Sequence, residues 1–144
     1  MKLVDSFTIT HGSNRIMSSI QIQLSSNLYC KDPQSTDLGK RIVLDSIQLI
    51  SEIGFEAFTF KKLSTRIEST EASIYRYFGN KHKLLVYLIA WYWAWMEYKI
   101  EYETHHLQDS REKLDKIIHL ITERKVPDET FPDIDEEALN KIVI

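Results

Sequence analysis

The chain has 144 residues, of which 43% are hydrophobic, and a formal charge of −3 at pH 7. This length suits one domain, or a small domain joined to part of another, and the apolar content is sufficient for a packed core. Its single cysteine, Cys30, excludes an intramolecular disulfide and a cysteine-rich metal site. A soluble globular protein without a signal-peptide pattern is therefore expected, located in the reducing cytoplasm.

The first 31 residues are expected to form an N-terminal arm. Residues 3–10 are rich in β-branched side chains, and residues 20–24 alternate between apolar and polar, so a small hairpin is one interpretation. The alternative is a poorly ordered tail without a function. Because Met17 opens the alternating segment, a further hypothesis is that residues 1–16 lie upstream of the natural start.

The first helix is predicted to begin between Asp32 and Thr36, since Asp32 precedes a proline and Thr36 is a second candidate N-cap. It should end at Gly54, because glycine tolerates the backbone conformations that follow a helix. Lys40 and Arg41, near its start, are either solvated charges or phosphate contacts. The apolar stripe of this helix is wide enough to pack against two neighbours and consists of Ile42, Val43, Ile47, Leu49, Ile50 and Ile53.

The next stretch can be read as two short helices joined by a tight turn. Thr59 is a candidate N-cap for a helix over residues 60–67, and Thr70 is one for a helix over residues 71–78. A glycine and an asparagine then stop the second helix and cap the following one. Apolar residues recur at helical spacing and should face inward: Phe60, Leu63, Ile67, Ile74 and Phe78. The pattern predicts a helix-turn-helix.

The surface of this unit is basic. Residues 59–83 contain six lysine and arginine side chains against two glutamates, a local charge of +4, so the remainder of the chain sums to −7. Such polarity is typical of a protein with one face on DNA. The second helix is the predicted recognition helix, and base reading is assigned to its outward residues Glu71, Ser73, Arg76 and Tyr77. The alternative for Glu71 is that it contacts no DNA, and that its negative charge in the first turn only stabilises the helix through the helix dipole.

Residues 74–85 read Ile-Tyr-Arg-Tyr-Phe-Gly-Asn-Lys-His-Lys-Leu-Leu, and Gly54-Phe55 is followed by Phe58-Thr59. In these residues, and continuously over about residues 36–88, the chain resembles the TetR/AcrR family of transcriptional regulators. The turn departs from the family pattern. Where the family usually carries Ala-Gly-Val-Ser, residues 67–70 are Ile-Glu-Ser-Thr. A positive φ at Glu68 would then cost about 1 kcal/mol.

The resemblance implies an all-α fold: a three-helix helix-turn-helix DNA-binding domain over residues 32–80, then a long linking helix and a partial, shortened regulatory domain within residues 81–144. It also implies phosphate contacts by Thr59, Tyr75 and Lys81, with Lys61 or Lys62 assisting. The whole predicted DNA-binding set is Thr59, Lys61, Lys62, Thr70, Glu71, Ala72, Ser73, Tyr75, Arg76, Tyr77 and Lys81.

A long helix is predicted from Lys81 to about His106. It contains an apolar run, residues 84–96, which is shorter than the roughly 20 residues that span a membrane, so a core helix and no membrane partner are expected. Two apolar stripes run side by side along this helix. Its aromatic residues are either core and dimer contacts or a pocket for a small apolar or cationic effector, and they include Trp91, Tyr92, Trp95 and Tyr98.

A fifth helix is predicted over about residues 110–124, with Leu114, Ile117, Ile118 and Ile121 packing on the long helix. Val126-Pro127 should end it, and a sixth helix should open at residue 134 or 135. The acidic residues 128–137 are expected to lie in solvent. In the family the regulatory domain continues through further helices that form the usual dimer interface. The expectation is therefore either that the chain is a truncated form or that the dimer contact lies elsewhere, with the aromatic surface of the long helix as the best substitute.

The function predicted from these patterns is sequence-specific DNA binding by a transcriptional regulator, specifically a ligand-responsive repressor that binds a palindromic operator as a homodimer. The alternative is a helical protein-interaction module that keeps the fold without binding operator DNA. No catalytic motif is present, so neither an enzyme nor a cofactor is expected. Glu101 and His105 share one helix face, but two ligands are too few for a zinc site.

Overall fold

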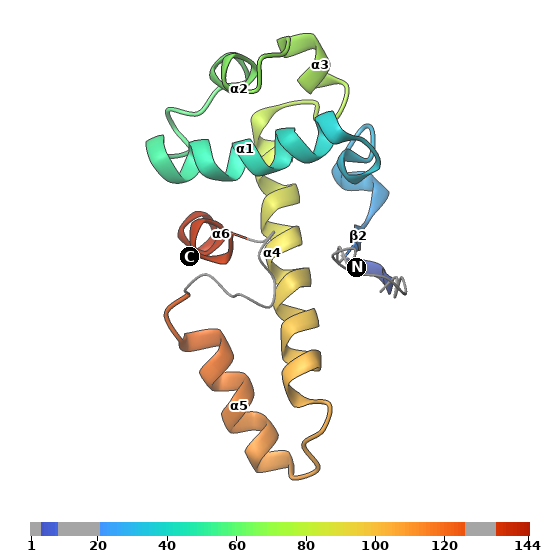
Figure 1. The fold of residues 1–144 in the computed structure, drawn as a ribbon, viewed down its shortest axis with the longest axis vertical. Coiled ribbons are helices and arrows are strands. Elements are labelled where there is room, and N and C mark those ends of the chain that lie inside the picture. The colour runs from blue at the N-terminus through green and yellow to red at the C-terminus, as the bar shows by residue number, and fades with distance from the viewer. Residues whose placement is uncertain (1–3, 9–20, 126–134) are drawn as a thin grey trace, which may run out of the picture.

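The computed structural model describes residues 4–8, 21–125 and 135–144. The described α-helices are α1 (Asp37–Ile53), α2 (Phe60–Arg66), α3 (Glu71–Tyr75), α4 (Lys81–Thr104), α5 (Ser110–Thr122) and α6 (Glu136–Val143). Two short 3-10 turns, η1 (Ser26–Leu28) and η2 (Pro33–Ser35), precede them, together with strands β1 (Val4–Thr8) and β2 (Gln21–Leu24). The all-α class is confirmed, and the ribbon of β1 and β2 is an addition at one side of it (Figure 1).

The first helix, α1, begins one residue after its N-cap. The Thr36 side chain accepts the backbone N–H of Gly39 at 3.0 Å, which confirms Thr36 as the cap. A Cβ on Gly39 would lie 2.1 Å from the carbonyl oxygen of Pro33, so only glycine lets η2 pack this closely on α1. At the other end Gly54 has φ 78°, as the predicted stop requires.

The two short helices form the predicted helix-turn-helix. The Thr59 side chain accepts the N–H of Lys62, and the Thr70 side chain accepts the N–H of Ser73, so both predicted caps are confirmed. All the side chains predicted to face inward are buried: Phe60, Leu63, Ile67, Ile74 and Phe78. Ser64 of α2 is buried as well. Figure 1 shows α2 and α3 together at one end of the molecule, above α1.

The long helix α4 links the helix-turn-helix to the rest of the chain, as predicted. It is capped by Asn80, whose side chain accepts the N–H of Lys83 at 2.9 Å. Neighbouring elements cover it on two sides, α6 on one and β2 on the other (Figure 1). This two-sided cover explains why its large side chains are fully buried, among them Trp95, Tyr87 and Tyr92.

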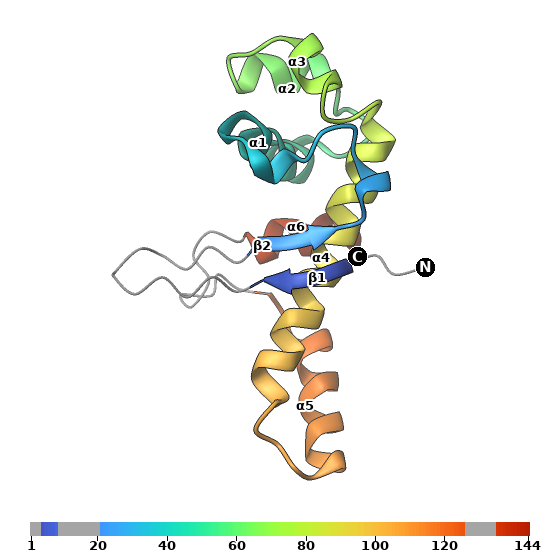
Figure 2. The same cartoon turned by 90° about the vertical axis from the view of Figure 1, so that its right-hand side faces the viewer.

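The N-terminal ribbon is antiparallel, with Phe7 opposite Ile22 and Val4 opposite Leu24. Ile22 and Leu24 are buried in the same core as residues of α4. Figure 2 shows the two paired strands β1 and β2 side by side. The hairpin interpretation therefore holds for the paired strands. The hypothesis of a start at Met17 concerns residues outside the described ranges.

The apolar stripe of α5 does not pack as predicted. Leu114, Ile118 and Ile121 are exposed, whereas Leu120 is the fully buried residue of this helix. The spacing correctly indicated an amphipathic helix, and α5 does contact α4. Of the predicted stripe, however, only Ile117 is half-buried.

The last helix, α6, is inserted between α1 and α4 and contacts both. Its cap is Asp135, as expected, and its first residue, Glu136, is buried. The Glu136 carboxylate lies 3.1 Å from the ammonium of Lys99 on α4 and 3.7 Å from that of Lys125, and both ammonium groups are buried too. The prediction that the acidic residues up to 137 lie in solvent is thus wrong for Glu136. The predicted helix end at Val126-Pro127 and acidic residues 128–133 lie outside the described ranges.

Candidate nucleic-acid interface

The outer side of α2 presents two lysines. Lys61 and Lys62 are both exposed, and the Lys62 ammonium donates to the carbonyl of Ala57 at 2.8 Å, in the loop before the helix. Thr59 is exposed at the helix start, where its hydroxyl oxygen already serves as the cap. These three residues place positive charge and a hydroxyl at the N-terminal end of α2, a common position for phosphate contacts.

The outer side of α3 carries most of the predicted base-reading residues. Glu71, Ala72 and Arg76 are exposed, Ser73 is half-buried, and Thr70 is exposed at the cap. The hydroxyls of Thr70 and Ser73 lie 2.9 Å apart, so each orients the other. The exposed set spans the length of this short helix, and it combines donors and acceptors that can reach base edges.

Tyr75 is anchored but open. Its side chain is 51% exposed, and its ring meets the ring of buried Phe60 edge-on, with the centroids 5.0 Å apart. One face of the ring thereby packs on α2 while the rest stays at the surface. This position suits the predicted phosphate contact by the phenol hydroxyl.

Tyr77 does not lie on the outer face, and its assignment as a base reader is wrong. It follows Ile74 by three positions, shares the inner side with it and is only 3% exposed. Its hydroxyl lies 2.7 Å from the Thr36 hydroxyl at the start of α1, and its carbonyl accepts the N–H of Cys30 at 2.8 Å. Tyr77 therefore joins the end of the recognition helix to the segment before α1, a contact that the sequence pattern did not indicate.

The ammonium of Lys81 is engaged inside the chain. It donates to the carbonyls of Phe55, Glu56 and Phe58 at 3.2, 3.3 and 3.2 Å, and it lies 4.7 Å from the centroid of the Phe55 ring. An ammonium has three donors, so these contacts use all of them. The side chain therefore holds the loop between α1 and α2, which favours a structural role for Lys81, and its phosphate contact stays a prediction.

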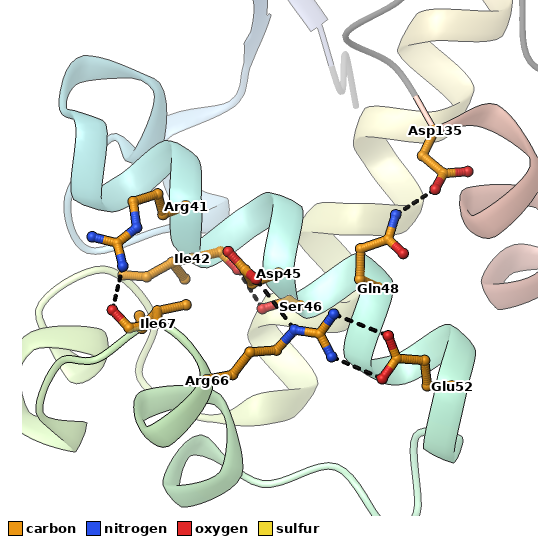
Figure 3. Close-up of polar contacts among 9 residues, drawn as sticks. All are labelled: Arg41, Ile42, Asp45, Ser46, Gln48, Glu52, Arg66, Ile67 and Asp135. Carbon is orange, nitrogen blue, oxygen red and sulfur yellow. Dashed lines mark hydrogen bonds and ion pairs between the residues drawn. The ribbon is translucent and has the colours of Figure 1, made fainter.

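The side chain of Arg66, at the end of α2, also points toward α1 (Figure 3). Its guanidinium donates to both carboxylate oxygens of Glu52, at 2.8 and 2.9 Å, and to Asp45 at 3.2 Å. The hydrogen bond from Arg66 lowers the pKa of Glu52, and the same bond raises the pKa of Arg66. Although Arg66 counts toward the basic charge of this region, its charge is offset by the two acids of α1.

The helix α1 also holds the turn and α6. Arg41 donates to the carbonyl of Ile67 in the turn. Its side chain thus makes a contact within the chain, which neither of the two earlier interpretations, a solvated charge or a phosphate contact, had included. Gln48 donates to the carboxylate of Asp135 at the start of α6 (Figure 3). One helix thus positions α2, the turn and α6 relative to one another.

The aromatic candidates on α4 are mostly interior. Tyr92 and Trp95 are buried, and the Tyr92 hydroxyl accepts from the Asn140 amide of α6 at 2.9 Å. Trp91 and Tyr98 are half-buried. The four residues therefore do not form one open surface, and a dimer contact through Tyr92 and Trp95 is excluded by their burial within the chain. No group of three or more potential metal ligands occurs among the described residues.

No helix in the described ranges is long and apolar enough to cross a membrane. Residues 42–88 match the family model "Bacterial regulatory proteins, tetR family". No curated protein and no solved structure matches the chain. The matched residues run from α1 through α2 and α3 into α4, which is the unit whose outer face is described above. Residues 42–88, the helix-turn-helix domain, are therefore similar to the TetR family of bacterial regulatory proteins, which supports a DNA-binding regulator with an N-terminal helix-turn-helix.

Proposed function

We propose that this DNA-binding regulator is a ligand-responsive repressor that acts in the cytoplasm and binds a palindromic operator as a homodimer. The observation that carries the proposal is the outer face of α2 and α3. It exposes Lys61, Lys62 and Arg76 on helices whose ends are capped and whose inner sides are fully packed. A rigid helix with an exposed polar side is the element that enters a major groove.

The outer face divides into positioning and reading residues. Thr59, Lys61, Lys62 and Tyr75 lie at the ends of α2 and α3 and are proposed to bind phosphates, which fixes the orientation on the duplex. The reading residues would be Thr70, Glu71, Ala72, Ser73 and Arg76 on α3. Arginine pairs best with guanine, and a carboxylate can accept from the N4 amine of cytosine, so a site rich in G·C pairs is expected.

The dimer follows from the size of the reading element. A helix as short as α3 contacts too few base pairs for useful specificity, so two copies must reach successive major grooves roughly 34 Å apart. The contact between copies has to avoid Tyr92 and Trp95, which are buried. The exposed apolar stripe of α5, Leu114, Ile118 and Ile121, is the surface we propose for it.

The proposed effector is a small apolar or cationic molecule. Trp91 and Tyr98 are half-buried on α4 and Trp93 is 43% exposed, so aromatic rings are accessible in the half of the chain that does not hold the helix-turn-helix. Aromatic faces attract both apolar groups and cations. Such a ligand would act by favouring one arrangement of α4, which joins the two halves.

Selection of binding sites from a library of random DNA duplexes tests this function. We expect enrichment of an inverted repeat whose half-sites lie about one helical turn apart, and sedimentation of the complex should show two chains per duplex. Ile118→Asp should shift the free protein toward a monomer. Failure to enrich any sequence would instead favour a helical interaction module that does not bind operator DNA.

A further inference from the structure

We propose that Lys31 is an additional DNA-phosphate contact, carried to the DNA-binding face by the segment of residues 30–36, named here the N-terminal strap. Lys31 precedes both α1 and the region matched by the family model. The inference rests on the proposed binding of DNA by the outer face of α2 and α3. It extends that face to a part of the chain outside the helix-turn-helix.

The N-terminal strap is attached to the end of the recognition helix. The backbone N–H of Cys30 donates to the carbonyl of Tyr77 at 2.8 Å, and the hydroxyls of Thr36 and Tyr77 lie 2.7 Å apart. The strap therefore contacts Tyr77 from both of its ends. Tyr77 is adjacent in sequence to Arg76, one of the proposed base readers, so these contacts hold the strap beside the C-terminal end of α3.

The side chain of Lys31 is placed over this junction. It is exposed, and its ammonium lies 5.2 Å from the centroid of the Tyr77 ring. Tyr77 is itself buried, so the exposed ammonium of Lys31 is the charge that reaches solvent at the junction between the strap and the end of α3. An exposed ammonium that meets an aromatic ring on one side keeps its other side in water, where it can bind an anion.

The strap is rigid enough to hold a contact in place. Pro33 is buried against α1, and the Gln34 amide donates to the hydroxyl of Tyr87 on α4 at 3.2 Å. The neighbouring acid, Asp32, accepts the N–H of Gln34 at 2.9 Å and so caps η2. With Asp32 directed to the backbone, Lys31 and Arg76 supply two positive charges near the end of α3.

The dependence of DNA affinity on salt tests the proposal, because each phosphate contact adds about 0.9 to the slope of log affinity against log salt concentration. Fluorescence anisotropy on a labelled duplex recovered by the selection would be measured for the wild type, Lys31→Gln and Lys31→Arg. Arg111→Gln is the matched control: it removes one exposed charge on α5, at the far end of the molecule from α3 (Figure 1).

We expect Lys31→Gln to weaken binding several-fold near 100 mM salt and to reduce the slope by about 0.9, while Lys31→Arg and Arg111→Gln keep the wild-type slope. The melting temperature of Lys31→Gln should stay close to that of the wild type, so that unfolding does not explain the loss of DNA affinity. An unchanged slope in Lys31→Gln, or an equal loss in Lys31→Arg, overturns the proposal and leaves the helix-turn-helix function standing. A wild type that binds no duplex even at low salt overturns the proposed function itself.

Discussion

The guanidinium of Arg66 donates two parallel hydrogen bonds to the carboxylate of Glu52, at 2.8 and 2.9 Å, and so joins α2 to α1. The pair is partly open to solvent, with the Arg66 side chain 33% and the Glu52 side chain 52% exposed. Exposed ion pairs contribute little to folding free energy. The bidentate geometry instead fixes the orientation of α2, and with it the position of Lys61 and Lys62.

This pair predicts how stability depends on pH. The hydrogen bond from Arg66 lowers the pKa of Glu52 in the folded state, with a Coulombic contribution from the same residue, while desolvation opposes it. A lowered carboxyl pKa contributes stability above the unfolded-state pKa, and this contribution is lost as the pH falls through the folded-state pKa.

Glu52→Gln should therefore lower the melting temperature slightly at pH 7, and the difference from the wild type should vanish well below pH 4.5, the ordinary value for glutamate. Thermal denaturation followed by circular dichroism at the two pH values measures this. Glu97→Gln is the control, since Glu97 is an exposed carboxylate on α4. A difference that persists at low pH would mean that the ion pair is not the source.

The turn between α2 and α3 carries the predicted backbone strain. Glu68 has φ 52°, a conformation that costs a residue with a Cβ about 1–2 kcal/mol. Glu68→Gly should raise the free energy of unfolding by about 0.5–1 kcal/mol, because relief of strain exceeds the added entropy of the unfolded chain. Urea denaturation measures the change. Glu68→Ala removes the same charge but keeps the Cβ, so a gain of equal size in that variant would contradict the explanation.

Local sequence signals predicted the helix-turn-helix well because they are short-range. Thr36, Thr59, Thr70 and Asn80 each cap a helix through a side chain three residues or fewer from its partner. The strain at Glu68 was also predictable, since the family pattern places glycine there. Tyr77 was not, because its burial depends on a hydroxyl partner, Thr36, that lies 41 positions away in the sequence.

Lys81 is expected to affect affinity through structure. Lys81→Gln removes the ammonium from three carbonyls of the loop between α1 and α2, which should lower the free energy of unfolding by about 1–2 kcal/mol. DNA affinity should fall while the salt slope stays at the wild-type value. For comparison, Lys61→Gln should reduce the slope by about 0.9 and leave stability unchanged. A reduced slope in Lys81→Gln would restore Lys81 as a phosphate contact.

The buried carboxylate of Glu136 holds two buried ammonium groups, those of Lys99 and Lys125. Glu136→Leu should cost about 3–5 kcal/mol of unfolding free energy, because both buried ammonium groups lose their ion pair with the Glu136 carboxylate. The control is the adjacent Glu137→Leu, which removes an exposed ion pair with Lys141 and should cost at most about 1 kcal/mol.

Adding Lys99→Met to Glu136→Leu should recover part of the loss, since one of the two buried cations around residue 136 is then removed as well. Additive effects of the two changes, measured by urea denaturation, would contradict the assignment of this cluster as a coupled unit.

The other wrong or missing predictions have the same physical cause as the one for Tyr77: they depend on contacts between residues that are distant in the sequence. Charged residues are by default at the surface, so sequence patterns gave no reason to bury Glu136 with Lys99. The stripe of Leu114 and Ile118 showed that α5 is amphipathic, but periodicity alone does not say which neighbour covers which face. Lys81 matched a family position, while its actual partners are backbone carbonyls that carry no sequence signal.

Arg76 tests most directly whether the exposed side of α3 reads bases. The measurement is the ratio of affinities for the selected duplex and a scrambled duplex of equal length, at one salt concentration, for the wild type and Arg76→Ala. We predict that the substitution lowers this ratio about 10–100-fold, the value of one bidentate base contact, and weakens binding to the scrambled duplex only slightly. An unchanged ratio, with equal losses on both duplexes, would contradict base reading by α3.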